Sequence, residues 1–179
     1  MFLQINITPD GLIRYPMHKH KNFEILLYLE GQGELLTERG GIPFASGSII
    51  IVPAGIEHGS VSLDGFKNIS IEGDFDRYFC FDSVKLLHDN DSLEGTRLAS
   101  LIFENRYGDE AYLEALCTAY IRFLLRYFES EGYMKSAVET LIRRISENAF
   151  DPNIRLSRIL SESGYSEDYI RSCFGRVTG

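Results

Sequence analysis

The sequence has few cysteines, no long apolar run and no excess of positive charge, and each shortage excludes a class of protein. Cys80, Cys117 and Cys173 are odd in number, far apart and without a C-x2-C pair. This pattern favours reduced thiols in a cytoplasm over a disulfide or zinc framework. No apolar run approaches the roughly 18 residues that cross a membrane, and no basic segment precedes an apolar stretch at the start. We therefore expect a cytoplasmic protein with no membrane partner.

The chain has 179 residues, which are enough for one well-packed domain, alone or with a small second domain. Its charge is unevenly distributed. Residues 137–179 carry six arginines and six acidic residues, so the whole net charge of -8 falls in residues 1–136. Portions that differ this much in charge are consistent with different partners. A net charge of zero is still far from the basic excess of an isolated nucleic-acid-binding domain.

Residues 1–73 have the pattern of short β-strands separated by turn residues. The segment 23–29 is apolar on nearly both faces, which is typical of a strand buried in a closed sheet or sandwich. We expect a turn at residues 31–33. The expected strands recur at similar spacing and cover residues 23–29, 34–38, 48–52, 58–63 and 66–71. Many short strands at even intervals predict a β-sandwich or barrel of the jelly-roll kind.

Three of the four histidines fall in one pattern with an acidic residue. His18 and His20 are two residues apart, and Glu24 shares their face if the strand continues unbroken. His58 follows a Pro-x-Gly turn and is expected to join them from a neighbouring strand. Three imidazoles and a carboxylate are a plausible metal set. The same groups are equally suited to a hydrogen-bonded polar floor for an organic ligand, without metal.

These residues resemble the two signature motifs of the cupin barrel, H-x-H-x3-E-x6-G and G-x5-P-x-G-x2-H. The matched residues are His18, His20, Glu24, Gly31, Gly47, Pro53, Gly55 and His58. Leu12 replaces the leading glycine of the first motif, and Ser62 replaces an asparagine that often follows the second. The resemblance implies a cupin barrel that binds one divalent metal (Zn, Ni, Mn or Fe) or an effector at the three histidines and Glu24. We place Leu26 and Tyr28 in the effector pocket.

Helical spacing of apolar residues replaces the strand pattern in residues 74–130. A longer helix is expected over residues 109–129, and its aromatic load exceeds what packing on a small barrel needs. Intramolecular core is one explanation of this load, and a homodimer interface is the one we favour. The proposed interface residues lie along one stripe: Leu116, Tyr120, Phe123, Leu124 and Tyr127. Residues 131–136 are expected to form a linker.

Residues 137–179 are expected to be helical and to contain a helix-turn-helix. The frame G-Y-S-x-x-Y-[LI]-x-x-x-F-x-x-x-x-G is present as Gly164, Tyr165, Ser166, Tyr169, Ile170, Phe174 and Gly179. It resembles the first helix-turn-helix of the AraC/XylS-type transcription regulators, although Leu160 replaces a small alanine. In that family a cupin-like sensor precedes dimerisation helices and a DNA-binding domain with two such motifs. The second motif would follow Gly179, so we expect this chain to be chiefly the sensor half.

The resemblance implies DNA contacts in the full-length protein from the recognition helix and from arginines that face phosphates. The candidates are Arg155, Arg158, Ser166, Glu167, Asp168, Arg171, Ser172 and Arg176. The order of segments along the chain is a barrel (1–73), covering and dimerisation helices (74–130), a linker (131–136) and a partial helix-turn-helix domain (137–179).

This order predicts a ligand-responsive transcription regulator, not an enzyme, whose barrel senses a small molecule such as a sugar or another metabolite. The alternatives are a metal-dependent cupin enzyme (an isomerase or dioxygenase) and a metal sensor. Tyr28 and Glu30 are the only further polar candidates on the same strand parity for an enzyme.

Overall fold

The computed structural model describes residues 2–79 and 81–129, with side chains of the last helix described as far as Arg126. The chain forms two compact units, one of residues 1–77 with 84–124 and one of residues 78–83 with 125–179. The first unit contains all the strands described below, the first helix and most of the second. It is therefore the unit that positions the candidate site.

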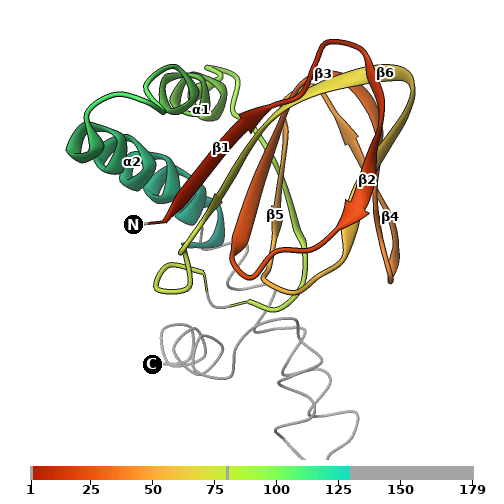
Figure 1. Ribbon diagram of the computed structural model, residues 1–179, viewed down its shortest axis with the longest axis horizontal. Helices are drawn as coiled ribbons and strands as arrows, with labels where there is room; N and C mark the ends of the chain where they lie inside the picture. The colour runs from red at the N-terminus through yellow and green to blue at the C-terminus, as the bar shows by residue number, and fades with distance from the viewer. Residues whose placement is uncertain (1, 80, 130–179) are drawn as a thin grey trace, which may run out of the picture. The chain divides into compact units, whose positions relative to one another are not determined.

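An antiparallel barrel is followed by two helices (Figure 1). The strands are β1 (Leu3–Ile7), β2 (Leu12–His18), β3 (Phe23–Thr37), β4 (Gly40–Ala45), β5 (Ser48–Val52), β6 (His58–Gly73) and β7 (Lys85–His88), and the helices are α1 (Glu94–Glu104) and α2 (Glu110–Glu129). The strand order is β1-β6-β3-β5-β7, with β2 paired to β6 and β4 paired to β3. This arrangement confirms the predicted fold class, an all-β cupin-like barrel followed by helices.

Two long strands, β3 and β6, replace the pairs of shorter strands predicted from the sequence. The predicted turn at residues 31–33 is wrong, because this segment lies inside β3 and register shifts beside it bend the strand. A Cβ at Gly31 would collide with the backbone of Gly65, and the φ of Gly31 is +84°. Glycine is required there by the close approach of β3 to β6, not by a hairpin turn.

Residues 23–28 of β3 and the whole of β5 are buried on both faces, because the barrel interior lies on one side and the helices on the other. Inside the barrel, Leu26 and Tyr28 belong to an apolar cluster with Phe44 and Phe66. On the outer face, a Cβ built at Gly95 of α1 would contact the side chains of Ile49 and Phe123. Figure 1 shows both helices on the same side of the sheet, beside β1. This two-sided packing explains the nearly continuous apolar sequence at the start of β3, residues 23–29.

The segment between β6 and α1, residues 74–93, includes β7, a strand of the sheet that the sequence pattern did not predict. Strand β7 pairs with β5, and Asp89 directly after it caps α1. The Asp89 carboxylate accepts hydrogen bonds from the backbone N–H of Gly95 and Thr96, both at 2.8 Å, and from the Thr96 hydroxyl at 2.7 Å. These contacts satisfy N–H groups that have no partner within the helix. Within the described residues, no helix combines the length and apolarity needed to span a bilayer.

The side chains predicted to form a dimer interface are largely buried within the single chain. Tyr120, Phe123 and Leu124 are 0–2% exposed and Leu116 is 9% exposed, while the side chain of Tyr127 lies outside the described part. Their apolar area is therefore already packed and does not form an exposed patch. This burial favours the intramolecular alternative for the apolar load of α2, and the place of these residues at a dimer interface stays a prediction. Dimerisation itself stays a prediction.

Candidate metal and effector site

Four side chains converge at one end of the barrel, and they come from three strands and the connection between two of them. His18 is the last residue of β2, His20 lies in the connection to β3, Glu24 is the second residue of β3, and His58 is the first residue of β6. The strand does not continue unbroken from His18 to Glu24, because β2 ends at His18 and β3 begins at Phe23. The expectation for His58 is confirmed: it lies opposite His18 in the β2–β6 pair.

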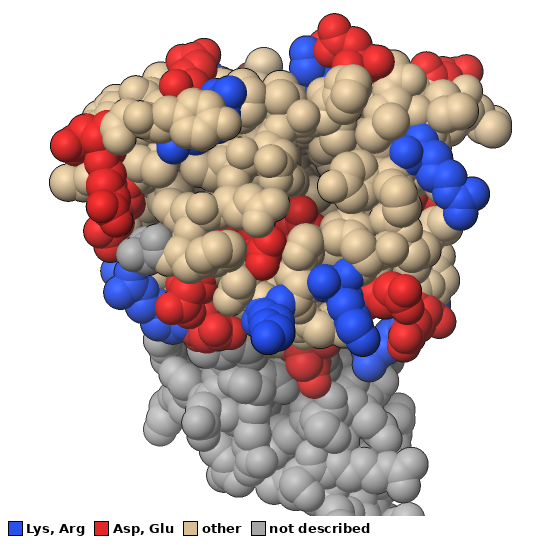
Figure 2. All heavy atoms as spheres, viewed as in Figure 1, with Lys and Arg blue, Asp and Glu red and all other residues tan. Residues whose placement is uncertain are grey.

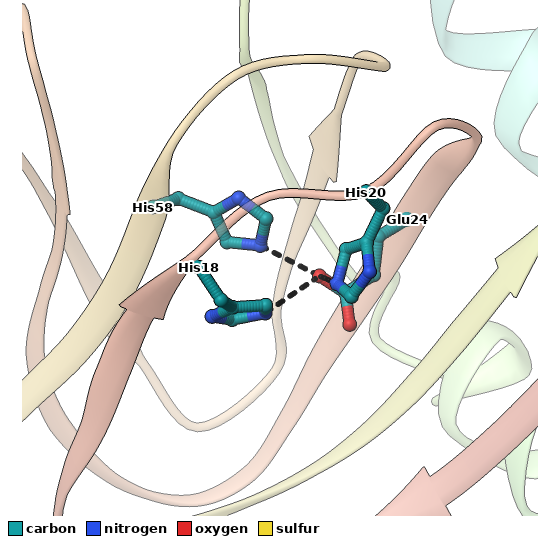
Figure 3. A group of neighbouring side chains, drawn as sticks. All are labelled: His18, His20, Glu24 and His58. Carbon is teal, nitrogen blue, oxygen red and sulfur yellow. Dashed lines mark hydrogen bonds and ion pairs between the residues drawn. The ribbon is translucent and has the colours of Figure 1, made fainter.

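The ring nitrogens of the three histidines gather around one carboxylate oxygen, as Figure 3 shows. The distances from Glu24 Oε2 are 2.7 Å to His58 Nε2, 3.5 Å to His20 Nε2 and 3.9 Å to His18 Nε2. One potential ligand atom from each of the four residues lies within 4.8 Å of the others. His58 and Glu24 are buried, whereas His18 and His20 are partly exposed. The four groups are therefore close enough to share one ion.

The Nδ1 atoms of His18 and His58 are both occupied by backbone carbonyls two residues earlier in the chain. His18 Nδ1 lies 2.8 Å from the Pro16 oxygen, and His58 Nδ1 lies 2.9 Å from the Ile56 oxygen. A carbonyl oxygen only accepts, so Nδ1 carries the proton in each ring. This leaves Nε2 of both rings directed at Glu24. Histidines that bind metals commonly have their other ring nitrogen held in this way.

Glu24 and His20 perturb one another electrostatically. Burial acts to raise the pKa of Glu24, but its contacts with His20 and His58 outweigh burial and lower the pKa to about 2. The Glu24 carboxylate raises the pKa of His20 more than partial burial lowers it, with a smaller contribution from Glu72. The carboxylate is therefore held ionised in a buried position, which requires positive charge beside it.

The donor set fits a divalent transition metal. Three imidazole nitrogens and one carboxylate oxygen suit zinc, iron, nickel or manganese. His20 Nε2 is buried and has no hydrogen-bond partner among the described residues. The 2.7 Å contact between His58 and Glu24 requires either a proton on Nε2 or a cation shared by the two atoms. Each of these features is accounted for by an ion placed between the four groups.

A cavity of about 250 Å³ lies beside these ligands. Its lining includes His18, Glu24 and His58 together with uncharged polar side chains and a few apolar ones. The other lining residues are Asn6, Ile7, Thr8, Pro9, Tyr15, Leu26, Ser60, Asn68 and Ser70. Leu26 thus lies in the cavity wall, and its role in an effector pocket stays a prediction. Tyr28 does not line it, but its hydroxyl is 2.8 Å from Ser60 Oγ, directly behind the wall.

Sequence reasoning missed the polar residues that β6 contributes to the interior. Ser60, Asn68, Ser70 and Glu72 are at even positions, but they fall on both sides of a bend in β6. The pairing of β6 with β3 identifies three of them as inward-facing. Asn68, Ser70 and Glu72 lie opposite Tyr28, Leu26 and Glu24, which alternate along the inner face of β3. Glu30, suggested as a catalytic candidate, is exposed and lies outside this cavity.

All the residues predicted to contact DNA lie outside the described residues. They are Arg155, Arg158, Ser166, Glu167, Asp168, Arg171, Ser172 and Arg176. Within the described part, Figure 2 shows basic and acidic side chains interspersed around the rim of one face, not gathered in a single basic patch.

Comparison with known proteins places the barrel in a family. The AraC-like ligand binding domain matches residues 11–102, which include all four converging side chains and most of the cavity wall. The chain belongs to this family. No curated protein sequence matches it significantly.

Several solved structures are similar to parts of this AraC-like chain. ToxT from Vibrio cholerae is 12% identical, with a TM-score of 0.48 over 97% of this chain and 76% of that one. A cupin-2 domain containing protein from Shewanella frigidimarina is 21% identical, with a TM-score of 0.36 over 39% of this chain and 69% of that one. Protein NMB1881 from Neisseria meningitidis is 24% identical, with a TM-score of 0.36 over 39% of this chain and 72% of that one.

Proposed function

We propose that this chain is a ligand-sensing transcription regulator, and that its barrel binds a small-molecule effector beside a bound metal ion. The observation that carries this proposal is the 250 Å³ cavity inside an AraC-like ligand-binding domain, lined by three of the four converging side chains. A molecule in this cavity would lie against the proposed metal. Effector binding and metal binding are therefore expected to be coupled.

The metal would be held by His18, His20, Glu24 and His58, and it would offer Lewis-acid positions to an oxygen of the effector. The protein supplies the orientation of these ligands through the Pro16 and Ile56 carbonyls. It also supplies one negative charge next to the ion, from Glu24. A divalent ion beside this one carboxylate keeps a net charge of about +1. A neutral ligand, or a ligand with a single anionic oxygen, is compatible with that charge.

The cavity wall favours a small hydroxylated metabolite, for which a sugar is one example. The described lining residues include no lysine or arginine, so the wall itself offers no cationic side chain to an acidic ligand. Ser60, Ser70, Asn6 and Asn68 offer neutral donors and acceptors instead. Ile7, Pro9 and Leu26 supply the apolar contacts that complete a typical small-molecule site.

We further propose that the regulator contacts DNA through the helix-turn-helix that the sequence of residues 137–179 resembles, and that it acts as a homodimer. The balanced charge of this segment predicts weak DNA affinity for residues 1–179 alone, because phosphate neutralisation supplies much of the affinity. An anisotropy titration with DNA at physiological salt tests this expectation. Nanomolar sequence-dependent binding by this chain would contradict it.

Metal analysis and calorimetry test the proposal for the barrel. The purified protein is expected to bind one zinc or nickel ion per chain, and His58→Ala is expected to abolish this binding. His88→Ala is the matched control, because His88 is exposed on β7 and outside the cluster. A panel of neutral sugars and hydroxy acids is then titrated into the metal-loaded and metal-free protein. Effector binding that is equal in both forms would contradict the coupling, and metal-dependent turnover of a bound compound would favour the enzyme alternative.

A further inference from the structure

His20 is held differently from the other two histidines of the site. The Nδ1 atoms of His18 and His58 meet backbone carbonyls within their own segments. His20 lies in the connection between β2 and β3, and its Nδ1 atom instead lies 3.2 Å from Glu72 Oε2. Glu72 is far away in sequence, near the end of β6. The orientation of His20 therefore depends on a side chain from another strand.

Glu72 is itself fixed at this place. It is 8% exposed and lies directly opposite Glu24 in the β3–β6 pair. Its second carboxylate oxygen accepts a hydrogen bond of 3.0 Å from Asn22 Nδ2. Asn22 and His20 belong to the same connection, so Glu72 binds this connection at two points. The Glu72 carboxylate is not part of the four-residue group whose ligand atoms lie within 4.8 Å.

We propose that Glu72 is a positioning residue of the metal site, which holds His20 with Nε2 directed at the ion, and that Asn22 holds Glu72. A carboxylate that accepts the Nδ1–H proton fixes the tautomer and the ring plane, and it increases the basicity of Nε2. His20 needs such a partner because its backbone is not held in a strand. This inference rests on the metal binding proposed above.

The test compares zinc affinity among single and double variants of the full chain, measured by competition with a chromophoric chelator. Glu72→Ala is expected to weaken zinc binding about 10- to 100-fold, as loss of such outer partners commonly does. Glu72→Gln keeps the side-chain volume and one acceptor, so a smaller loss is expected. Asn22→Ala is expected to lose less than Glu72→Ala. Glu30→Gln is the control, because Glu30 is an exposed carboxylate on β3, and it should bind zinc as the unmodified protein does.

A double-mutant cycle separates positioning of His20 from general support of the fold. If Glu72 acts through His20, then Glu72→Gln in a His20→Ala background causes no further loss of affinity. Additive losses, or unchanged affinity in both Glu72 variants, would overturn the inference while leaving the metal site intact. The absorption spectrum of bound cobalt(II) gives a second readout, which should change in Glu72→Gln and not in Glu30→Gln. If the unmodified protein binds neither zinc nor cobalt, the metal site and this inference fall together.

Discussion

The two halves of the barrel interior are built from the same strands and yet have opposite character. Along the inner face of β3, Glu24 faces the histidines, Leu26 lines the cavity, and Tyr28 is packed in an apolar cluster. In that cluster the rings of Tyr28 and Phe44 stack at 3.6 Å between centroids, and Phe66 closes against both. In the other half, polar groups surround a cavity. One half of the barrel therefore stabilises the fold, so that the other half can hold charged groups and open space.

The largest expected effect belongs to the packed half. Phe66→Ala is expected to lower the free energy of unfolding by about 3–5 kcal/mol, because Phe66 is 1% exposed and its loss leaves a cavity beside the stacked rings of Tyr28 and Phe44. Leu63→Ala on the same strand is the control, and it should change stability by less than about 0.5 kcal/mol because Leu63 is 98% exposed. Urea denaturation of the two variants measures the difference. Equal effects would mean that the packed half is not what stabilises the barrel.

The charged half should make stability depend on pH in the metal-free protein. The pKa of Glu24 is lowered from 4.5 to about 2, so its ionised form stabilises the fold above about pH 4.5, and this contribution is lost as pH falls toward 2. The pKa of His20 is raised from 6.5, so its contribution is present below pH 6.5 and is lost as pH rises through the folded-state value. The interaction of Glu24 with His20 is therefore expected to stabilise the fold most between about pH 4.5 and 6.5.

Replacing the carboxylate tests this dependence. In the unmodified protein the free energy of unfolding is expected to decline between pH 4.5 and 2. Glu24→Gln is expected to reduce this decline by an amount on the order of 3 kcal/mol. The measurement is urea denaturation of the metal-free variant and unmodified protein across this range. Glu30→Gln should reproduce the unmodified profile. Parallel profiles for Glu24→Gln and the unmodified protein would show that this buried carboxylate does not govern the acid sensitivity.

The two halves also differ in how far the sequence alone predicted them. The four converging residues were identified, because a spacing of glycines, proline and histidines constrains the local chain. The course of β3 was not predicted, because residues 31–33 have the glycine content of a turn. The role of Gly31 is determined instead by the close approach of Gly65, which is distant in the sequence. Glu72 was missed for the same reason, since only the pairing of β6 with β3 places it opposite Glu24. The apolar spacing of α2 indicates that the stripe containing Phe123 is covered. It does not specify whether the same chain or a second subunit covers it, because periodicity carries no information on packing partners.

Tyr28 lies at the boundary between the halves and is expected to show an intermediate effect. Tyr28→Phe keeps the stacking on Phe44 and removes the hydroxyl, which lies 2.8 Å from Ser60 Oγ. A loss of about 0.5–1.5 kcal/mol is expected, which is the usual net contribution of one hydrogen bond. Ser60 lines the cavity, so a water molecule there can replace the lost partner and keep the effect small. Thermal unfolding of the variant measures it, and a loss above about 3 kcal/mol would show that the hydroxyl also supports the cavity wall.

Tyr120 offers the opposite case and the smallest expected effect. Its side chain is 1% exposed, but its hydroxyl has no hydrogen-bond partner among the described residues. Burial, with a smaller contribution from the charge of Asp89, raises the pKa of this hydroxyl, so it stays neutral. A buried donor without a partner costs free energy, so Tyr120→Phe is expected to leave the free energy of unfolding unchanged or to raise it by up to about 1 kcal/mol. The stacking of this ring on Phe123 is the same in the variant and in the unmodified protein. If the variant instead loses more than about 1 kcal/mol while Tyr28→Phe loses less, the Tyr120 hydroxyl stabilises the fold and the contrast between the two tyrosines is reversed.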